Sequence, residues 1–362
     1  MHIQTLKLTH FRNIAHARLD VGAARVVALY GHNGAGKTSV LEALSLLSPG
    51  RGLNGVKLQE YIQKEQASWG LFSELATIGG EHAVGMSYEK NGAASGKRQI
   101  KIDGDMVPSQ AELGQLGNVL WFSPKMDRLF LGPAQPRREF LDRMVYGFYP
   151  DHAQALTTYR HHLKARTRLL KDGADPDWIG LEEDQAAVAA AKIMRNRHNY
   201  LTRLKEFLDE NGRIKVVGSV QKYMDLSDTE LADKLSEEFK NHRMKDAERG
   251  STAVGPHRCD VVGKLYLDDK EIFLGHTSSG QHKRAVLSVL LANARLIHSA
   301  QGELPLMLFD EVSAHLDKAA RETFTQAFLD LGAQIWLAGT DKDSLEITDD
   351  IHFIHAHRGQ FD

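Results

Sequence analysis

The chain has 362 residues, of which 42% are hydrophobic and 25% charged, as in ordinary globular proteins with two or three domains. Its formal net charge of −2 argues against a general attraction to nucleic acid, so DNA contact would need a local basic patch. A single cysteine excludes an internal disulfide, and the lack of a long apolar stretch excludes a membrane-spanning helix, so we expect a cytoplasmic protein without a membrane partner.

The first 30 residues predict an antiparallel strand pair followed by a buried strand, Val26–Tyr30. The next residues match G-x-x-x-x-G-K-[ST], and an apolar helix pattern follows them. Such a loop wraps its backbone N–H groups around phosphate oxygens, with the lysine on the β- and γ-phosphates and the threonine on Mg²⁺. The sequence therefore predicts a nucleoside triphosphate site formed by Gly31, His32, Asn33, Gly34, Ala35, Gly36, Lys37, Thr38 and Ser39.

Three strand-like segments follow at 71–78, 83–88 and 98–102, and the last ends in Asp103-Gly104, a hairpin-type turn pair. A short buried strand is expected at 119–122. We expect this part of the chain to form an antiparallel β subdomain of the nucleotide-binding head.

The pattern becomes helical after Pro136, with segments 137–171 and 180–210 separated by 172–176. A capping box at Ser227 predicts a further helix to about Glu248. We expect a helical lobe at 126–245 inserted into an α/β head formed by 1–125 and 246–362. Residues 213–219 are a candidate to return to the head sheet.

The first helical segment carries cations and no acid over Tyr159–Lys171, and clustered cations suit phosphate contacts. The alternative is an ordinary solvated helix face. A second basic candidate is the hairpin strand near residue 98. The predicted DNA contacts are Arg160, Lys164, Arg166, Arg168, Lys97 and Arg98.

The buried strand 304–309 ends in Asp310-Glu311, the pattern of a nucleotide hydrolysis site. Asp310 would hold Mg²⁺, and Glu311 would position the attacking water as the catalytic residue. An Asn-Lys-x-Asp base-recognition motif is missing from the sequence, so ATP is favoured over GTP.

A Ser-x-Gly-Gln turn precedes the helix expected at 283–298, and its residues are Ser278, Gly280 and Gln281. Such a turn offers a hydroxyl and N–H groups to a phosphate, although it could equally be a simple helix cap. Its place between the P-loop and Asp310-Glu311 is typical of ABC-type ATPases, in which it closes over the ATP of the opposite subunit. Asp317 follows where the two nucleotide sites of such dimers communicate.

The chain resembles the RecF family of bacterial DNA replication and repair proteins, short-armed relatives of the SMC-type ATPases. Beside the motifs above, the resemblance rests on 8–13, Phe122-Ser123-Pro124, the Arg-Arg-x-Phe-Leu-Asp run at 137–142 and Gly255-Pro256-His257-Arg258. Two positions depart from the family pattern: Lys125-Met126 replaces an acidic pair, and Cys259-Asp260 replaces Asp-Asp.

This resemblance implies an ABC-type head that dimerises on ATP and hydrolyses it slowly, stimulated by DNA. It implies binding to single- and double-stranded DNA at gaps without sequence preference, loading of recombinase with RecO and RecR, and a part in DNA damage repair, recombination and the SOS response. It also implies that Arg12 and Asn13 lie beside the nucleotide and that Thr340 senses the γ-phosphate.

Two other functions share this chemistry. An ABC transporter ATPase needs a membrane partner and normally has Leu-Ser-Gly-Gly-Gln and a switch histidine where this chain has Thr340. An SMC-like chromosome-organising protein needs a long coiled coil, and the insert here is short and irregular.

Overall fold

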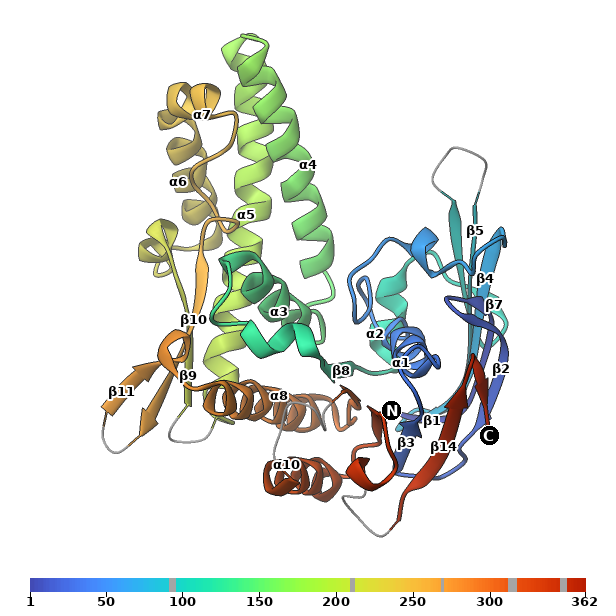
Figure 1. Cartoon of the computed structure of the whole chain (residues 1–362). Coiled ribbons are helices and arrows are strands. Elements are labelled where there is room, and N and C mark those ends of the chain that lie inside the picture. The colour runs from blue at the N-terminus through green and yellow to red at the C-terminus, as the bar shows by residue number, and fades with distance from the viewer. Residues whose placement is uncertain (91–95, 209–211, 268–269, 312–317, 346–349) are drawn as a thin grey trace. The chain divides into compact units, whose positions relative to one another are not determined.

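A computed structural model describes residues 1–90, 96–208, 212–267, 270–311, 318–345 and 350–362 (Figure 1). The chain divides into two compact units. One comprises Met1–Asp127 and Ser278–Asp362, and the other comprises Arg128–Thr277. Residues 246–277, assigned above to the head, therefore belong to the second unit.

The first unit contains an antiparallel sheet in which polar and apolar side chains alternate, so that one face is buried. Asp103 and Gly104 both have positive φ, 53° and 93°, and they connect the last two strands as the tight turn predicted from their sequence. In spatial order the strands are β2 (Ile14–Asp20), β1 (His2–Phe11), β4 (Ser68–Thr77), β5 (Gly80–Glu89), β6 (Lys97–Ile102) and β7 (Asp105–Met106).

The second sheet of this unit is mainly parallel, and its central strands are buried along their whole length because helices cover both faces. Its order is β15 (Gln360–Phe361), β14 (His352–His357), β3 (Val26–Tyr30), β13 (Ile335–Gly339), β12 (Leu306–Asp310) and β8 (Val119–Phe122). The register pairs Tyr30 with Gly339 and Ala338 with Asp310, so the carboxyl ends of three strands meet at one edge.

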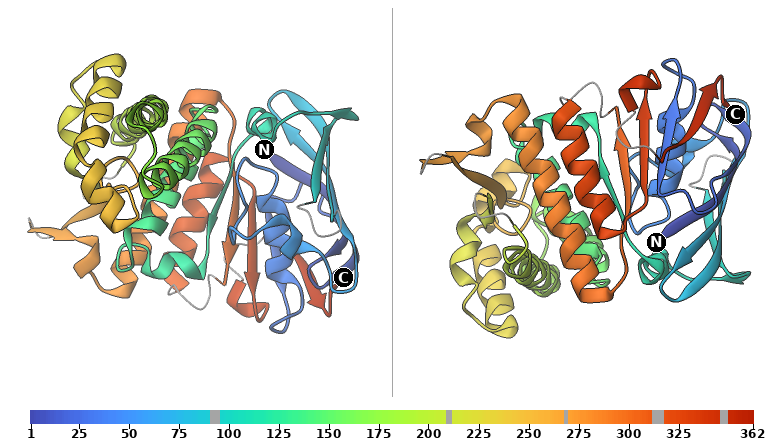
Figure 2. Two further views of the ribbon diagram at one scale, coloured as in Figure 1. Left: turned by 90° about the horizontal axis from the view of Figure 1, so that it is seen from above. Right: turned by 90° about the horizontal axis from the view of Figure 1, so that it is seen from below.

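Helix α1 (Lys37–Ser45) lies between the two sheets, and α8 (Ser279–Gln301) and α10 (Lys318–Leu331) cover the opposite face of the parallel sheet (Figure 2). The short helices of this unit are η1 (Leu58–Tyr61), η2 (Gln110–Glu112), α2 (Leu113–Leu116), η3 (Pro124–Arg128, which ends at the unit boundary) and η6 (Asp343–Leu345). This mixed α/β arrangement agrees with the ATPase head predicted from the sequence.

The second unit is mostly helical. Segment 137–171 is not one helix, because residues 147–151, with a glycine and a proline, interrupt it. The helices are α3 (Ala134–Tyr146), α4 (His152–Lys171), α5 (Pro176–Leu204), η4 (Ser219–Tyr223), α6 (Asp228–Asn241), α7 (Arg243–Arg249) and η5 (Leu274–His276). The Ser227 capping box is present, although the helix predicted to run to Glu248 is divided near His242.

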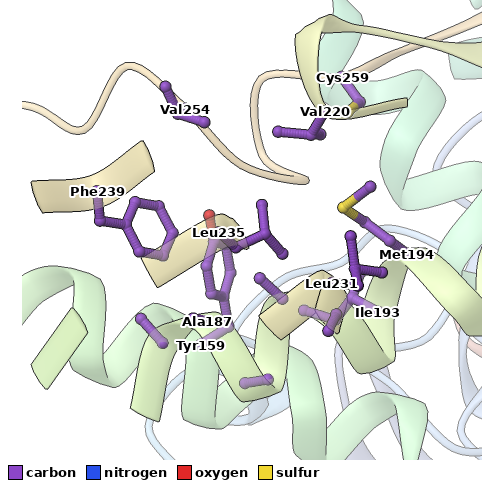
Figure 3. Packing of buried hydrophobic residues seen from close by; sticks show 14 of the residues in the cluster. Tyr159, Ala187, Ile193, Met194, Val220, Leu231, Leu235, Phe239, Val254 and Cys259 are labelled. Atoms are coloured by element: carbon purple, nitrogen blue, oxygen red, sulfur yellow. The ribbon is translucent and has the colours of Figure 1, made fainter. Parts of the chain in front are cut away.

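A small antiparallel sheet completes this unit, in the order β11 (Lys270–Phe273), β10 (Asp260–Leu267) and β9 (Gly212–Val217). Strand β9 covers most of the segment suggested to return to the head sheet, and it pairs here with β10 instead. The core of the unit packs α4, α5 and α6 around Tyr159, Ile193, Leu235 and Phe239, with Cys259 at its edge (Figure 3).

Candidate nucleotide site

The predicted phosphate loop connects β3 to α1 with a backbone that glycines permit. Gly34 and Gly36 have φ of 80° and 114°, a conformation that other residues adopt only at a cost. No side chain caps the N-terminus of α1, and its first turn carries no acid. The first N–H groups of α1 are therefore unpaired by a cap and oriented to receive an anion.

Gly31 is required for a different reason. A Cβ there would lie 2.2 Å from the Ala356 carbonyl oxygen on β14. The first glycine of the loop thus allows close packing of the neighbouring strand.

The Lys37 ammonium lies within the loop, donating to the carbonyl oxygens of Gly31 (2.6 Å) and His32 (2.9 Å). Burial lowers the pKa of this lysine, because a desolvated cation is less stable. A triphosphate bound in the loop would place negative charge beside the Lys37 ammonium and stabilise its charged form.

Thr38 and Asp310 meet although they are far apart in sequence: the Thr38 hydroxyl donates to Asp310 Oδ1 at 3.0 Å. Asp310 is 5% exposed, and its burial raises the pKa of the carboxyl to about 6. A hydroxyl and a carboxylate next to a phosphate site are the oxygen ligands that Mg²⁺ uses, so the residues present fit that ion.

Glu311 and Thr340 follow the neighbouring strands β12 and β13 at the same sheet edge. Glu311 has φ of 52°, an uncommon conformation for a non-glycine residue that is concentrated at functional sites. Its N–H donates to Ala338 O at 3.1 Å, and its side chain is exposed. The Thr340 hydroxyl donates to Asp341 Oδ2 at 3.0 Å. Asp317 lies outside the described residues.

Asn13 fastens the phosphate loop to the helix that follows it. Its amide donates to Gly34 O and its Oδ1 accepts from the Ser39 hydroxyl, both at 2.8 Å. Arg12 lies beside the same helix, where Glu42 binds its guanidinium through two hydrogen bonds of 2.6 and 2.9 Å.

Glu42 is a site residue that the sequence analysis missed. Its side chain is 3% exposed, and it accepts from both Arg12 and the Asn54 amide. The available signal was a charged residue one turn after Thr38, flanked on both sides by the apolar residues Leu41 and Ala43. A buried carboxylate at such a position needs partners.

The Ser-x-Gly-Gln turn caps α8 with a capping box. The Ser278 hydroxyl accepts from Gln281 N at 3.3 Å, and Gln281 Oε1 accepts from Ser278 N at 3.0 Å. A Cβ on Gly280 would meet nothing within 4 Å, and all three residues are exposed. The turn thus caps a helix and presents an open surface at the same time.

Lys125, which departs from the family pattern, lies in the loop after β8 and donates to Asn54 O at 3.1 Å. The other departure, Cys259, is buried, and its neighbour Asp260 forms an ion pair with Arg137 at 2.8 Å.

The predicted DNA contacts on α4 separate into two groups. Arg160, Lys164 and Arg168 are exposed. Arg166 is fully buried, where it binds Glu183 (2.9 Å) and Asp246 (2.8 Å). The assignment of Arg166 to DNA is therefore wrong, because a cation enclosed by two carboxylates cannot reach a phosphate.

The second basic candidate lies on β6 of the first unit. Lys97 is exposed there, whereas Arg98 is only partly exposed, and burial lowers its pKa.

In the described part of the chain, no helix combines the length and the hydrophobicity of a membrane span. The same residues contain no metal site of three or more His, Cys, Asp or Glu side chains, and the Mg²⁺ ligands considered above are a smaller set of one hydroxyl and one carboxylate.

Comparison with known proteins gives the family. Residues 2–360 match the RecF/RecN/SMC N terminal domain model. The protein described as "DNA replication and repair protein RecF" from Rhizobium leguminosarum bv. trifolii is 33% identical over 350 residues, covering 94% of this chain and 92% of the relative. The chain belongs to the RecF family. RecF proteins of Rhizobium etli and Agrobacterium fabrum are 34% and 33% identical over the same share of each chain.

Solved structures agree with this assignment. "Structure of the recombination mediator protein RecF-ATPrS in RecFOR pathway" covers 100% of this chain and 97% of its own, with a TM-score of 0.85 and 25% identity. The Pyrococcus furiosus Smc head domain matches over 99% of this chain and 95% of its own, with a TM-score of 0.51 and 14% identity, a likeness of fold alone. The predicted family and fold are thus confirmed.

Proposed function

We propose that this chain is an ATP-dependent DNA-binding protein of recombinational repair. The observation that carries the proposal is the convergence of Lys37, Thr38 and Asp310 in a RecF-family chain, with Thr38 and Asp310 joined by a 3.0 Å hydrogen bond. Lys37 would bind the β- and γ-phosphates, and Thr38 and Asp310 would hold Mg²⁺, which neutralises charge on the transferring phosphoryl group.

Hydrolysis would depend on Glu311, positioned by its backbone at the sheet edge to orient the attacking water. Thr340 would contact the γ-phosphate from the next strand. The exposed turn at Ser278–Gln281 would complete the site of a second copy, with the Ser278 hydroxyl exchanging its capping bond for a phosphate oxygen. ATP would thereby act as the bridge of a homodimer.

DNA would be the partner that stimulates this slow hydrolysis. The support is the family, whose curated relatives are named for DNA replication and repair, together with the exposed cations Arg160, Lys164 and Arg168. We propose cooperation with RecO and RecR at gapped DNA because a solved neighbour is described as part of the RecFOR pathway. Such a protein would act in the cytoplasm, where the chromosome lies.

A steady-state ATPase assay with and without gapped DNA tests this function. Wild type should hydrolyse ATP slowly and faster with DNA, whereas Lys37→Ala should neither bind ATP in a filter assay nor hydrolyse it. Unchanged turnover with DNA would contradict the proposal and favour a transporter-type ATPase. Normal ATP binding by Lys37→Ala would contradict the site.

A further inference from the structure

The second unit contains a cavity of about 410 Å³ that no step of ATP hydrolysis uses. Two of the segments that carry the family resemblance line it: α3 contributes Arg138 and Asp142, and the 255–258 segment contributes His257 and Arg258. Helix α4 adds Arg160. A volume of this size suits a specific ligand.

The cavity holds more positive than negative charge. Arg197 and Asp142 neutralise each other through hydrogen bonds of 2.7 and 2.8 Å, and His152 also contacts this carboxylate. His257 is neutral near pH 7, because burial lowers its pKa to about 4. Among the described residues that line the cavity, Glu139 is then the one acid not paired with an arginine, and the charge of Asp260 also acts on Arg138 from outside the lining. We call the cavity with Arg138, Arg160 and Arg258 the arginine pocket.

Two of these arginines, Arg138 and Arg258, donate only to uncharged acceptors among the described residues, and Arg160 makes no hydrogen bond to them. Arg138 donates to Cys259 O at 2.8 Å, and Arg258 donates to Thr252 O at 2.8 Å and to the Ser251 hydroxyl at 3.2 Å. Among the described residues, none of the three forms an ion pair within 4.0 Å. Three guanidinium forks around one cavity suit the several oxygens of a phosphate.

Burial and the nearby Arg197 lower the pKa of Arg138, which is the effect of placing like charges together away from water. An anion bound in the cavity would stabilise the charged form of Arg138 and so raise its pKa again.

The surroundings favour a polyanion over a small ion. Arg160 begins a line of exposed cations, with Lys164 and Arg168 at successive intervals of four residues on α4. An α-helix rises about 6 Å over four residues, and residues at this spacing share one face. A free phosphate would use the pocket but not the line, whereas a nucleic-acid backbone would use both.

We propose that the arginine pocket holds a backbone phosphate of DNA whose strand continues along Arg160, Lys164 and Arg168 on α4. This inference rests on the proposed DNA binding and gives a function to the Gly-Pro-His-Arg segment, which shapes the pocket and supplies Arg258. The contact reads no base, so it adds affinity without sequence preference.

Arg160 is the best residue to test, because it is exposed and its substitution would remove no hydrogen bond to the described part of the chain. Arg160→Gln should weaken binding to gapped DNA about tenfold, as expected for one charge-assisted contact. It should also reduce the log–log salt slope by about one unit. Arg160→Lys should restore the slope but only part of the affinity, because an ammonium lacks the guanidinium fork.

Lys245→Gln is the matched control: it removes one charge from an exposed position on α7 in the same unit, outside the pocket. Fluorescence anisotropy with labelled DNA at several salt concentrations measures all four proteins. If Arg160→Gln binds as tightly as Lys245→Gln while wild type binds DNA, the pocket inference is wrong and the proposed function stands. If wild type does not bind DNA, both fail.

Arginine modification by phenylglyoxal, followed by peptide mass spectrometry of the whole protein, gives a second readout. DNA should protect Arg138, Arg160 and Arg258 and leave Arg249 reactive. Inorganic phosphate at millimolar concentration should protect the pocket weakly. Protection by polyglutamate but not by DNA would contradict the proposal and identify the occupant as an acidic protein segment.

Discussion

At the scale of single residues, features of the backbone position the side chains of the nucleotide site. The secondary-structure propensity of each residue does not. Glu311 occupies a left-handed conformation with φ of 52° at the end of β12, and Asn13 joins the phosphate loop at Gly34 to α1 at Ser39. Removing the charge of a side chain at such a position should change ATP hydrolysis and leave the fold intact.

Glu311→Gln keeps the shape of the side chain and removes the carboxylate that would polarise water. We expect ATP binding within about threefold of wild type and turnover reduced by at least 100-fold, the order of a lost general base. Single-turnover hydrolysis and filter binding measure the two quantities. Glu322→Gln, a carboxamide change on α10 instead of the sheet edge, is the control. Turnover near the wild-type rate would exclude Glu311 as the catalytic residue.

His257 should make the second unit less stable in acid. Its Nε2 lies 3.0 Å from Thr252 O, so it must carry the proton, and Nδ1 accepts from the Tyr159 hydroxyl. The folded pKa of about 4 lies below the ordinary value near 6.5, so the unfolded chain protonates first as pH falls. The stabilisation is complete above pH 6.5 and decreases by about 3 kcal/mol by pH 4.

His257→Gln retains a donor and an acceptor without titrating. Hydrogen exchange of amides in α4 and α5 at pH 7 and pH 5 should show a larger loss of protection in wild type than in this variant. Equal losses would mean that His257 titrates normally in the fold.

At the scale of elements, most strands and helices followed from the sequence. Alternation identified the β1–β2 pair, apolar runs identified β3, β12 and β13, and Ser227 and Ser278 cap α6 and α8 as their motifs indicate. The break between α3 and α4 and the pairing of β9 with β10 were not predicted. The break has a local signal, Gly147 and Pro150, which the sequence analysis did not use. The pairing of β9 depends on tertiary contacts, which local periodicity does not encode.

The contacts of Arg166 could not be predicted from the sequence either. It belongs to a cationic run, but three residues of α4 with the same charge can face water while a fourth faces the core. Its partners, Glu183 and Asp246, lie on other helices.

Arg166→Leu should therefore destabilise the helical unit without affecting DNA directly. It leaves Asp246 without its cation and Glu183 with Arg243 alone, and breaking a buried ion pair costs about 3–5 kcal/mol. Hydrogen exchange of α4–α6 amides measures this loss. Arg168→Leu, on the same helix but 84% exposed, should cost under about 1 kcal/mol. Similar values for the two variants would contradict the buried network.

The N-terminus of α8 tests the proposed closure between two copies. Ser278→Arg should bind ATP as a monomer and fail to dimerise, because a long cation would occupy the surface that receives the opposite nucleotide. Ser227→Arg is the control, since it removes an equivalent capping box from α6. Light scattering with ATP measures the mass. A normal dimer of Ser278→Arg would show that the motif is only a helix cap.

At the scale of the whole molecule, sequence alone gave the P-loop, the acidic strand end and the family. It placed Asn13 beside the nucleotide but did not give the contacts that hold α1, where Ser39 donates to Asn13 and Glu42 accepts from Asn54. It also did not reveal that the two family segments at 137–142 and 255–258 enclose a common cavity. A cavity of this kind forms when segments that are distant in the sequence fold together, and no periodic pattern in the sequence predicts it.

The central claim is that ATP binding in the first unit controls the affinity of the whole protein for DNA. Fluorescence anisotropy with labelled gapped DNA tests it most directly, using Glu311→Gln so that ATP persists. DNA affinity should rise at least tenfold with ATP over ADP or no nucleotide, and Lys37→Ala should show no such rise. Equal DNA affinity of Glu311→Gln with ATP, with ADP and without nucleotide would contradict the account.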